Sequence, residues 1–100
     1  MTVNISFLSE FELPLLSGRM TCTTRYRRLG NRGDYFKAFG GLFVIEDIQR
    51  VYLYRVSRNY YSQEGFDSPG DFIACWKRTH PTRGYQPNSV VYLHKFGRVE

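Results

Sequence analysis

The chain has 100 residues, with a hydrophobic fraction of 42%, an aromatic fraction of 17% and a formal net charge of +5. This length fits one small domain that buries about two-thirds of its unfolded surface, and the composition excludes a disordered tail. No apolar run approaches the ~20 residues of a membrane span and no secretory signal is visible, so the sequence predicts one soluble, cytoplasmic domain over residues 1–100.

The first half of the chain predicts a strand, a short helix and three further strands. Residues 2–7 alternate polar and apolar side chains, which is typical of a strand with one buried face. Residues 9–18 carry apolar side chains at helical spacing and end on a glycine that suits a C-terminal cap, but Pro14 indicates a short or distorted helix. The next predicted strands are residues 21–26, 35–39 and 42–45.

The second half predicts a central strand, a helix and a closing strand. Residues 51–56 are apolar on both faces, which favours a central barrel strand. Ser68 and Pro69 form a helix-start signal, and His80-Pro81 predicts where that helix ends. A last strand is expected over residues 90–96. The predicted fold is α+β and mainly β: a small, nearly closed barrel of five to six strands with two flanking helices.

The whole net charge is concentrated in residues 13–33. This segment holds five arginines and no acid, whereas the rest of the chain has equal numbers of basic and acidic residues. One concentrated positive region attracts polyanions over ~8 Å at physiological salt, and arginine suits contacts with phosphates and bases. We therefore expect a polyanion-facing surface that includes Arg27 and Arg28. The alternative is that these surface arginines only keep the protein soluble.

The first candidate site lies in the segment Gly18-Arg19-Met20-Thr21-Cys22-Thr23-Thr24-Arg25. Side chains alternate along a strand, so Arg19, Thr21, Thr23 and Arg25 would project from one face. Hydroxyls both donate and accept hydrogen bonds, and guanidinium groups bind phosphate, so this face suits a phosphate or the edge of a nucleobase. A solvated polar strand face is the alternative interpretation.

A later turn supplies the other candidate residues. Tyr60 and Tyr61 offer flat surfaces that could stack on unpaired bases, although core packing is the alternative for tyrosines in a small barrel. Glu64 is the only acid between Asp47 and Asp67, and a lone carboxylate there could act as an acid or base or hydrogen-bond a nucleobase. A solvated turn residue, or an acid paired with an arginine, remains the alternative.

Cysteine and histidine spacing argues against a metal site. Cys22 and Cys75 have neither the dense pattern of a disulfide scaffold nor metal-ligand spacing, so both are predicted to be buried thiols. His80 and His94 also lack the spacing of zinc ligands. No metal or other cofactor is expected.

Taken in chain order, four motifs resemble the ASCH domain, a branch of the PUA-like barrel superfamily. They are Gly18-Arg19-Met20-Thr21-x-Thr23-x-Arg25, then Gly33-Asp34, then Glu64-Gly65-Phe66-x-Ser68-x-x-Asp71-Phe72 continuing through Trp76 to His80, and finally Val91-Tyr92-x-x-x-Phe96. Together they cover nearly the whole chain. The resemblance implies a β-barrel with a cleft between barrel and helices, and RNA-related roles.

The resemblance also bears on catalysis. Some ASCH proteins are amidohydrolases that remove the acetyl group from N-acetylcytidine, and others have been described as ribonucleases. In the amidohydrolase pattern, a lysine in Gly-Arg-Lys-Thr works with the second threonine and with an acid in the later turn. Carried onto this chain, those positions are Met20, Thr23 and Glu64.

The methionine separates this sequence from the catalytic pattern. A thioether has no ionisable proton and no charge, so Met20 cannot replace the lysine unless another cation, such as Lys37 or Arg25, takes over in space. The leading prediction is a non-catalytic module that binds RNA, a nucleoside or a nucleotide. The alternatives are an N-acetylcytidine amidohydrolase or ribonuclease with a non-standard site, in which Thr23 and Glu64 would act, and an adaptor for an acidic protein.

Overall fold

The computed structural model describes residues 1–99. In chain order the elements are η1 (Ser9–Phe11), α1 (Glu12–Ser17), β1 (Cys22–Arg25), β2 (Tyr35–Ala38), β3 (Gly41–Tyr52), α2 (Leu53–Asn59), α3 (Pro69–Thr79) and β4 (Val90–Arg98). The strands form an antiparallel four-stranded sheet in the order β1-β4-β3-β2. The fold is therefore α+β, as expected, but the half-barrel has four strands among the described residues instead of the predicted five to six.

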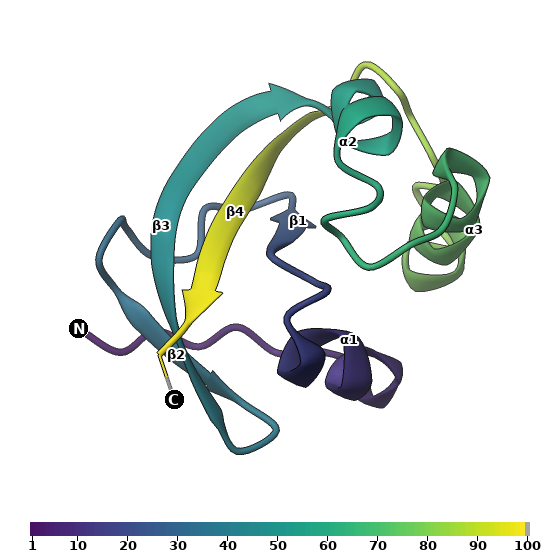
Figure 1. Ribbon diagram of the computed structural model, residues 1–100. Coiled ribbons are helices and arrows are strands. Elements are labelled where there is room, and N and C mark those ends of the chain that lie inside the picture. The colour runs from purple at the N-terminus through teal and green to yellow at the C-terminus, as the bar shows by residue number, and fades with distance from the viewer. Residues whose placement is uncertain (100) are drawn as a thin grey trace.

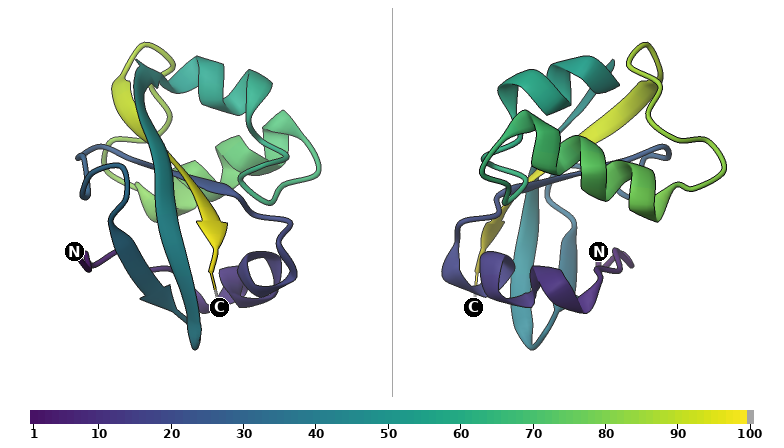
Figure 2. Two further views of the ribbon diagram at one scale, coloured as in Figure 1. Left: turned by 60° about the vertical axis from the view of Figure 1, so that its left-hand side comes forward. Right: turned by 90° about the vertical axis from the view of Figure 1, so that its right-hand side faces the viewer.

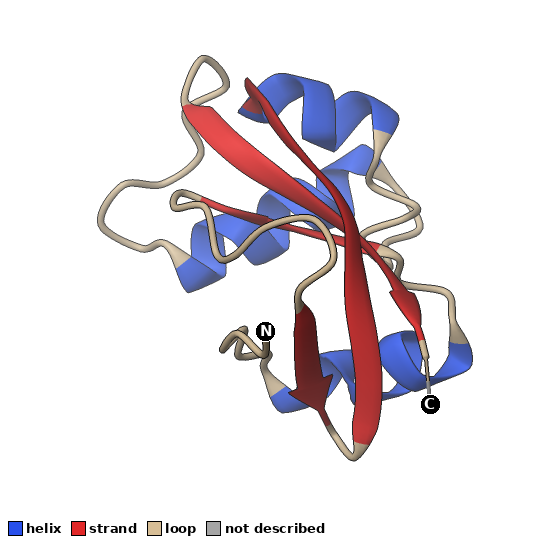
Figure 3. Cartoon of the chain, turned by 90° about the vertical axis from the view of Figure 1, so that its left-hand side faces the viewer, coloured by secondary structure: helices blue, strands red, loops and turns tan. Residues whose placement is uncertain are grey.

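The sheet is strongly curled, with helices at both of its ends. In Figure 1, α2 and α3 lie together where β3 ends and β4 begins, whereas α1 lies near the other end of β4. Figure 2 shows the same separation from two further directions. A β-bulge between Ile45 and Asp47 interrupts the β3–β4 register, and bulges increase local twist. The long strands consequently cross one another as they curl (Figure 3).

The two faces of the sheet bury two separate apolar clusters. The first cluster contains Phe36, Phe43 and Phe96, and the second contains Val91, Leu93 and residues of α2 and α3. Successive side chains of a strand point to opposite faces, so β4 contributes alternate residues to the two clusters. The short strand β1 lies at the edge of the sheet and likewise faces both.

The outer edge of β1 is covered by a turn from far along the chain. The backbone N–H groups of Thr21 and Cys22 both donate to the Gln63 carbonyl, at 2.8 and 3.2 Å. This contact places Glu64, the next residue, directly beside β1. The turn and the strand therefore form one local unit although they are about 40 residues apart in sequence.

Several local predictions are confirmed. Ser68 caps α3, because its hydroxyl oxygen accepts a hydrogen bond from the Asp71 backbone N–H at 3.1 Å. Pro69 occupies the first helical turn. Gly18 ends α1 in the left-handed conformation at φ 82°. The β2–β3 hairpin and β4 also occur where strands were expected.

The predicted strand over residues 2–7 is wrong. This segment makes only an isolated bridge, Thr2 to Tyr35, and runs into η1 without joining the sheet. Ile5 is nevertheless buried in the first cluster and Phe7 packs against it. The alternation thus reflects one buried side of an extended segment that has no strand partner.

The predicted strand over residues 51–56 is also wrong. β3 continues only to Tyr52, and α2 begins at Leu53. Leu53 and Val56 are three residues apart and are both fully buried in the second cluster. Because that spacing suits one face of a helix, packing against α3 and the sheet overrides the strand propensity of these residues.

None of the described helices is long and apolar enough to cross a membrane.

Candidate functional site

A cleft of about 490 Å³ opens between the segment of residues 6–11, β1, the turn at residue 64 and α3. Its apolar lining is largely aromatic, and its polar lining comes mainly from β1 and the turn. The aromatic residues are Phe7, Phe11, Phe66, Phe72 and Trp76. The main polar residues are Thr23, Thr24, Arg25, Glu64, Thr79 and His80. A ligand in this cleft would meet flat apolar surfaces and hydrogen-bonding groups together.

Glu64 is the most deeply buried charged residue of the cleft, with 4% of its surface exposed. The Thr24 hydroxyl donates to Glu64 Oε2 at 2.6 Å, and the Cys22 thiol lies 3.8 Å from the same oxygen. Burial raises the pKa of Glu64 to about 8, against the opposing effects of the Thr24 hydrogen bond and the Arg25 charge. At neutral pH the carboxyl group is therefore mostly protonated.

The second oxygen of Glu64 is not committed to the fold. Oε1 forms no hydrogen bond with any of residues 1–99, whereas Oε2 receives both contacts described above. Burial and the nearby Glu64 raise the pKa of Cys22 well above its ordinary range, so this thiol is not a nucleophile at neutral pH. The free hydrogen-bonding capacity at this point of the cleft belongs to Oε1.

Arg25 joins β1 to the N-terminal segment. Its Nη2 donates to the Ser6 carbonyl at 2.7 Å, its Nε lies 3.4 Å from Thr23 Oγ1, and its guanidinium lies 5.1 Å from the centre of the Phe7 ring. Burial lowers the pKa of Arg25, but a guanidinium remains charged in proteins. The cleft thus contains a fixed positive charge beside its hydroxyl groups.

An aromatic stack forms the α3 side of the cleft. The ring centres of Trp76 and His80 are 4.0 Å apart, and Phe72 stacks on the indole at 5.9 Å. The indole Nε1–H is buried and has no hydrogen-bond partner among the described residues. Because this N–H is shielded from solvent, the indole ring is the part of Trp76 that is offered to the cleft.

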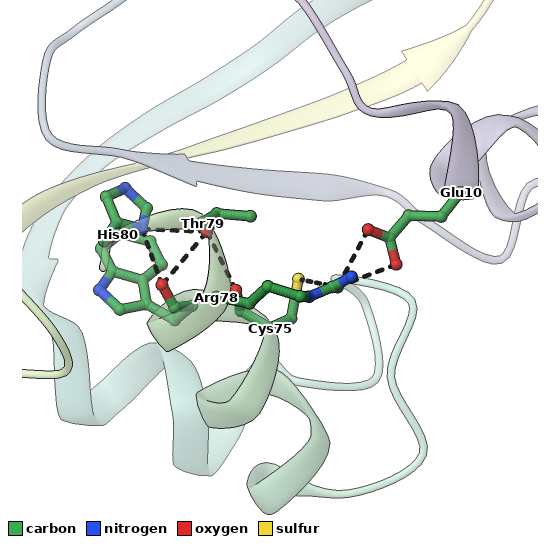
Figure 4. A network of polar contacts seen from close by, with 6 residues as sticks. Glu10, Cys75, Arg78, Thr79 and His80 are labelled. Carbon is green, nitrogen blue, oxygen red and sulfur yellow. Dashed lines mark hydrogen bonds and ion pairs between the residues drawn. The ribbon is translucent and has the colours of Figure 1, made fainter.

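The two walls of the cleft are also joined by an ion pair, shown in Figure 4. Arg78 of α3 lies 3.0 Å from the carboxylate of Glu10 in η1, and its Nη2 lies 3.4 Å from Cys75 Sγ. Figure 4 also shows His80 beside the Thr79 hydroxyl. His80 Nδ1 lies 3.0 Å from that hydroxyl and 3.0 Å from the Trp76 carbonyl. These contacts orient the end of α3 toward the cleft.

The structure brings together only part of the predicted site. Thr23, Arg25 and Glu64 line the cleft with Met20, which is 3% exposed and belongs to the first apolar cluster. Lys37 is exposed on β2 and does not line the cleft. Of the two cations that could replace the missing lysine, only Arg25 is therefore present at this site.

The other predicted residues lie outside the cleft. Arg19 is exposed and pairs with Asp67, and Thr21 is exposed at the start of β1. Arg27 and Arg28 are exposed after β1, where Arg28 Nε donates to the Gly30 carbonyl at 3.1 Å. Arg19 and Thr21 therefore do not share a cleft with Thr23 and Arg25.

The two adjacent tyrosines have packing roles. Tyr60 and Tyr61 are half-buried against the second apolar cluster and do not line the cleft. Lys95 Nζ lies 5.1 Å from the centre of the Tyr60 ring. These contacts correspond to the packing alternative for both rings.

Two contributors to the cleft were absent from the sequence-based site. Thr24, which holds Glu64, carried no signal beyond its place beside Thr23. Trp76 entered the sequence analysis only as part of an ASCH-like motif, and in the structure it both packs in the second apolar cluster and lines the cleft. Cys22 and Cys75 are both free and buried, as predicted. No group of three or more His, Cys, Asp or Glu side chains within residues 1–99 could hold a metal ion.

Comparison with known proteins shows similarity in structure without detectable similarity in sequence. No family model and no curated protein matches the chain. An ASCH domain from Lactobacillus crispatus JV V101 superposes with a TM-score of 0.70 at 12% identity, covering 98% of this chain and 79% of that one. Protein EF3133 from Enterococcus faecalis V583 gives 0.65 at 18% identity, covering 90% and 70%.

A third structure extends this result. The hypothetical protein PH0355 superposes with a TM-score of 0.71 at 11% identity, covering 93% of this chain and 94% of that one. At such identities the similarity establishes a shared fold. The resemblance to the ASCH domain is thereby confirmed at the level of the fold.

Proposed function

We propose that this protein, which has the fold of an ASCH domain, binds RNA or a nucleotide by accepting one base in the cleft. The observation that carries the proposal is the pairing of aromatic surfaces with an uncommitted hydrogen-bonding atom, Glu64 Oε1. A nucleobase is a flat ring with donors and acceptors on its edge, and it matches both parts. A volume of about 490 Å³ is within the range of small-molecule sites.

Glu64 has the chemistry to contact the base edge. Because Oε2 already accepts from Thr24, the proton of the neutral acid belongs on Oε1, which then donates. The proposed ligand therefore presents an acceptor, such as a ring nitrogen or a carbonyl oxygen, to Glu64 Oε1.

The basic segment would contact the rest of the nucleic acid. Arg27 and Arg28 are exposed near the end of β1, and Arg25 carries a fixed charge inside the cleft. If about four phosphates are neutralised, the logarithm of affinity for a single strand falls with log salt at a slope near −3. We propose a cytoplasmic location, in keeping with two free cysteines.

The cleft lacks the groups expected for catalysis. A methionine stands where the amidohydrolase pattern has lysine, and the acid beside it is mostly neutral at pH 7 because burial raises its pKa to about 8. A neutral carboxyl is a poor base, and a thioether cannot activate a hydroxyl. We therefore propose binding without turnover.

Amidohydrolysis of N-acetylcytidine is the second candidate, because Met20, Thr23 and Glu64 all line the same cleft. Incubation of the protein with N-acetylcytidine, followed by chromatography for cytidine, tests it. Turnover that is lost in Thr23→Ala would replace the binding proposal. Activity that arises only in Met20→Lys would support binding in the natural chain, because the lysine alone would then be missing.

The binding proposal is tested by fluorescence anisotropy with single-stranded RNA at low and moderate salt. Thr23→Val removes a buried cleft hydroxyl and should weaken binding about ten-fold, since a lost hydrogen bond to a buried group costs ~1–3 kcal/mol. Thr21→Val is the matched control, because Thr21 is exposed outside the cleft and should leave affinity within about two-fold of the original. Absence of binding at low salt, or equal effects of both variants, would reject the proposal.

A further inference from the structure

A stacked pair of tyrosines stands at the junction between β3 and α2. The rings of Tyr52 and Tyr54 are 5.8 Å apart and almost parallel, at 12°. Tyr52 ends β3 with 48% of its surface exposed, whereas Tyr60 and Tyr61 are half-buried against the second cluster. Tyr52 therefore presents an exposed aromatic surface outside the candidate cleft.

Two arginines accompany this ring. Tyr52 lines a groove of about 380 Å³ with Arg50, Val51, Arg55 and Val90, and no acidic residue is part of that lining. Arg50 and Arg55 are exposed, and neither forms an ion pair or hydrogen bond with any of residues 1–99. Both guanidinium groups are thus available to an anion.

The fold explains why these groups meet. Arg50 and Tyr52 are two residues apart in β3, so their side chains leave the same face of the strand. The chain then turns directly into α2, whose first turn carries Arg55. Tyr52 pairs with Val90 across the sheet, which adds an exposed apolar side chain beside the ring.

We propose that this groove binds one nucleotide of a single-stranded RNA, with the base stacked on Tyr52 and the neighbouring phosphates on Arg50 and Arg55. Base–aromatic stacking tolerates every base, and guanidinium groups bind phosphate in a forked geometry. The groove shares no lining residue with the cleft, so it is a second contact. The inference rests on the proposed function in one respect, namely that RNA is the ligand.

Charge and shape favour RNA over a protein partner here. The groove offers a flat ring together with two cations, a combination that fits a base and its neighbouring phosphates. An acidic protein would need only the arginines and would leave the tyrosine pair unexplained. Loss of a protein contact without loss of RNA affinity is therefore a distinct outcome of the test.

The test measures anisotropy of a labelled single-stranded RNA of about 20 nucleotides, which is longer than one OB-sized site of ~4–16 nucleotides. Tyr52→Ala should weaken binding about ten-fold, within the range of one lost stacking contact. Tyr35→Ala is the matched control, since Tyr35 is also exposed but lies on β2 outside the groove. Arg55→Gln should make the salt slope shallower by about 0.7, whereas Arg58→Gln, on the same helix and outside the groove, should change it less.

The outcomes separate the two proposals. An effect of Tyr52→Ala without an effect of Thr23→Val supports the groove and rejects the cleft. An effect of Thr23→Val with unchanged affinity in Tyr52→Ala and Arg55→Gln overturns the groove alone. Absence of RNA binding in the unaltered protein overturns both proposals. A Tyr52→Ala variant that loses a protein contact while its RNA affinity stays the same overturns the groove alone.

Discussion

The cleft and the groove hold their charged side chains in opposite ways. In the cleft, Arg25 is half-buried and fixed by the Ser6 carbonyl, and Glu64 is buried and fixed by the Thr24 hydroxyl. In the groove, Arg50 and Arg55 are exposed without an ion pair within residues 1–99. Fixed buried groups penalise any ligand that leaves them unpaired, whereas exposed cations attract many anions alike. The cleft is thus built to discriminate and the groove to add affinity.

The largest expected difference between these regions is in stability. Trp76→Ala removes a buried ring that packs on Phe72 and His80, and should lower the free energy of unfolding by about 3–5 kcal/mol. Tyr52→Ala, at an exposed position, should cost less than about 1 kcal/mol. Urea unfolding followed by circular dichroism measures both. Similar losses would show that the groove tyrosine is structural.

The next prediction concerns the buried acid. The pKa of Glu64 in the folded state is about 8, above its ordinary value, so the native state holds a proton that the unfolded state has released between pH ~4.5 and 8. The contribution of Glu64 to stability is therefore present at acidic pH and should fall by about 2–4 kcal/mol as pH rises across this window.

Glu64→Gln isolates that effect. The glutamine amide mimics the neutral acid, so its carbonyl can still accept from Thr24 and its NH₂ can still donate into the cleft. Urea midpoints measured from pH 5 to 8 should fall less in this variant than in the unaltered protein. Glu12→Gln, at an exposed position in α1, is the control and should keep the original trend. An unchanged trend in Glu64→Gln would contradict the assignment.

The smallest expected effect concerns a single exposed arginine. Arg27 is exposed like the groove arginines, and Arg27→Gln should weaken binding to single-stranded RNA about three-fold and reduce the salt slope by about 0.7. Binding of a free nucleoside, which has no phosphate, should stay within two-fold. Anisotropy for the RNA and calorimetry for the nucleoside distinguish these results. A larger loss for the nucleoside would place Arg27 at the cleft.

Local signals explain which parts of the fold were predictable. The start of α3 depends on Ser68 and Pro69, and the end of α1 depends on Gly18, so a few adjacent residues were enough. The boundary at Leu53 depends instead on which neighbours bury Leu53 and Val56. Their pattern suits either a strand or a helix, so only tertiary contacts decide between them.

The residues of the candidate site likewise divide into those that the sequence indicates and those that only tertiary packing brings to the cleft. Thr23 and Arg25 are two residues apart on a predicted strand, and Glu64 is the lone acid of its turn, so these three could be named from sequence. The aromatic wall could not, because Trp76 reaches the cleft only through the packing of α3. The availability of Tyr52 likewise depends on the end of β3, which the sequence pattern did not locate. The binding roles of all these residues stay predictions.

The turn that carries Glu64 has a further consequence, for solubility. Gln63 accepts both free N–H groups at the start of β1, and β1 is an edge strand of the sheet. An uncovered edge is a template on which a strand of another molecule can add. Substitutions that displace this turn should therefore promote aggregation as well as alter the cleft, and the two effects would share one cause.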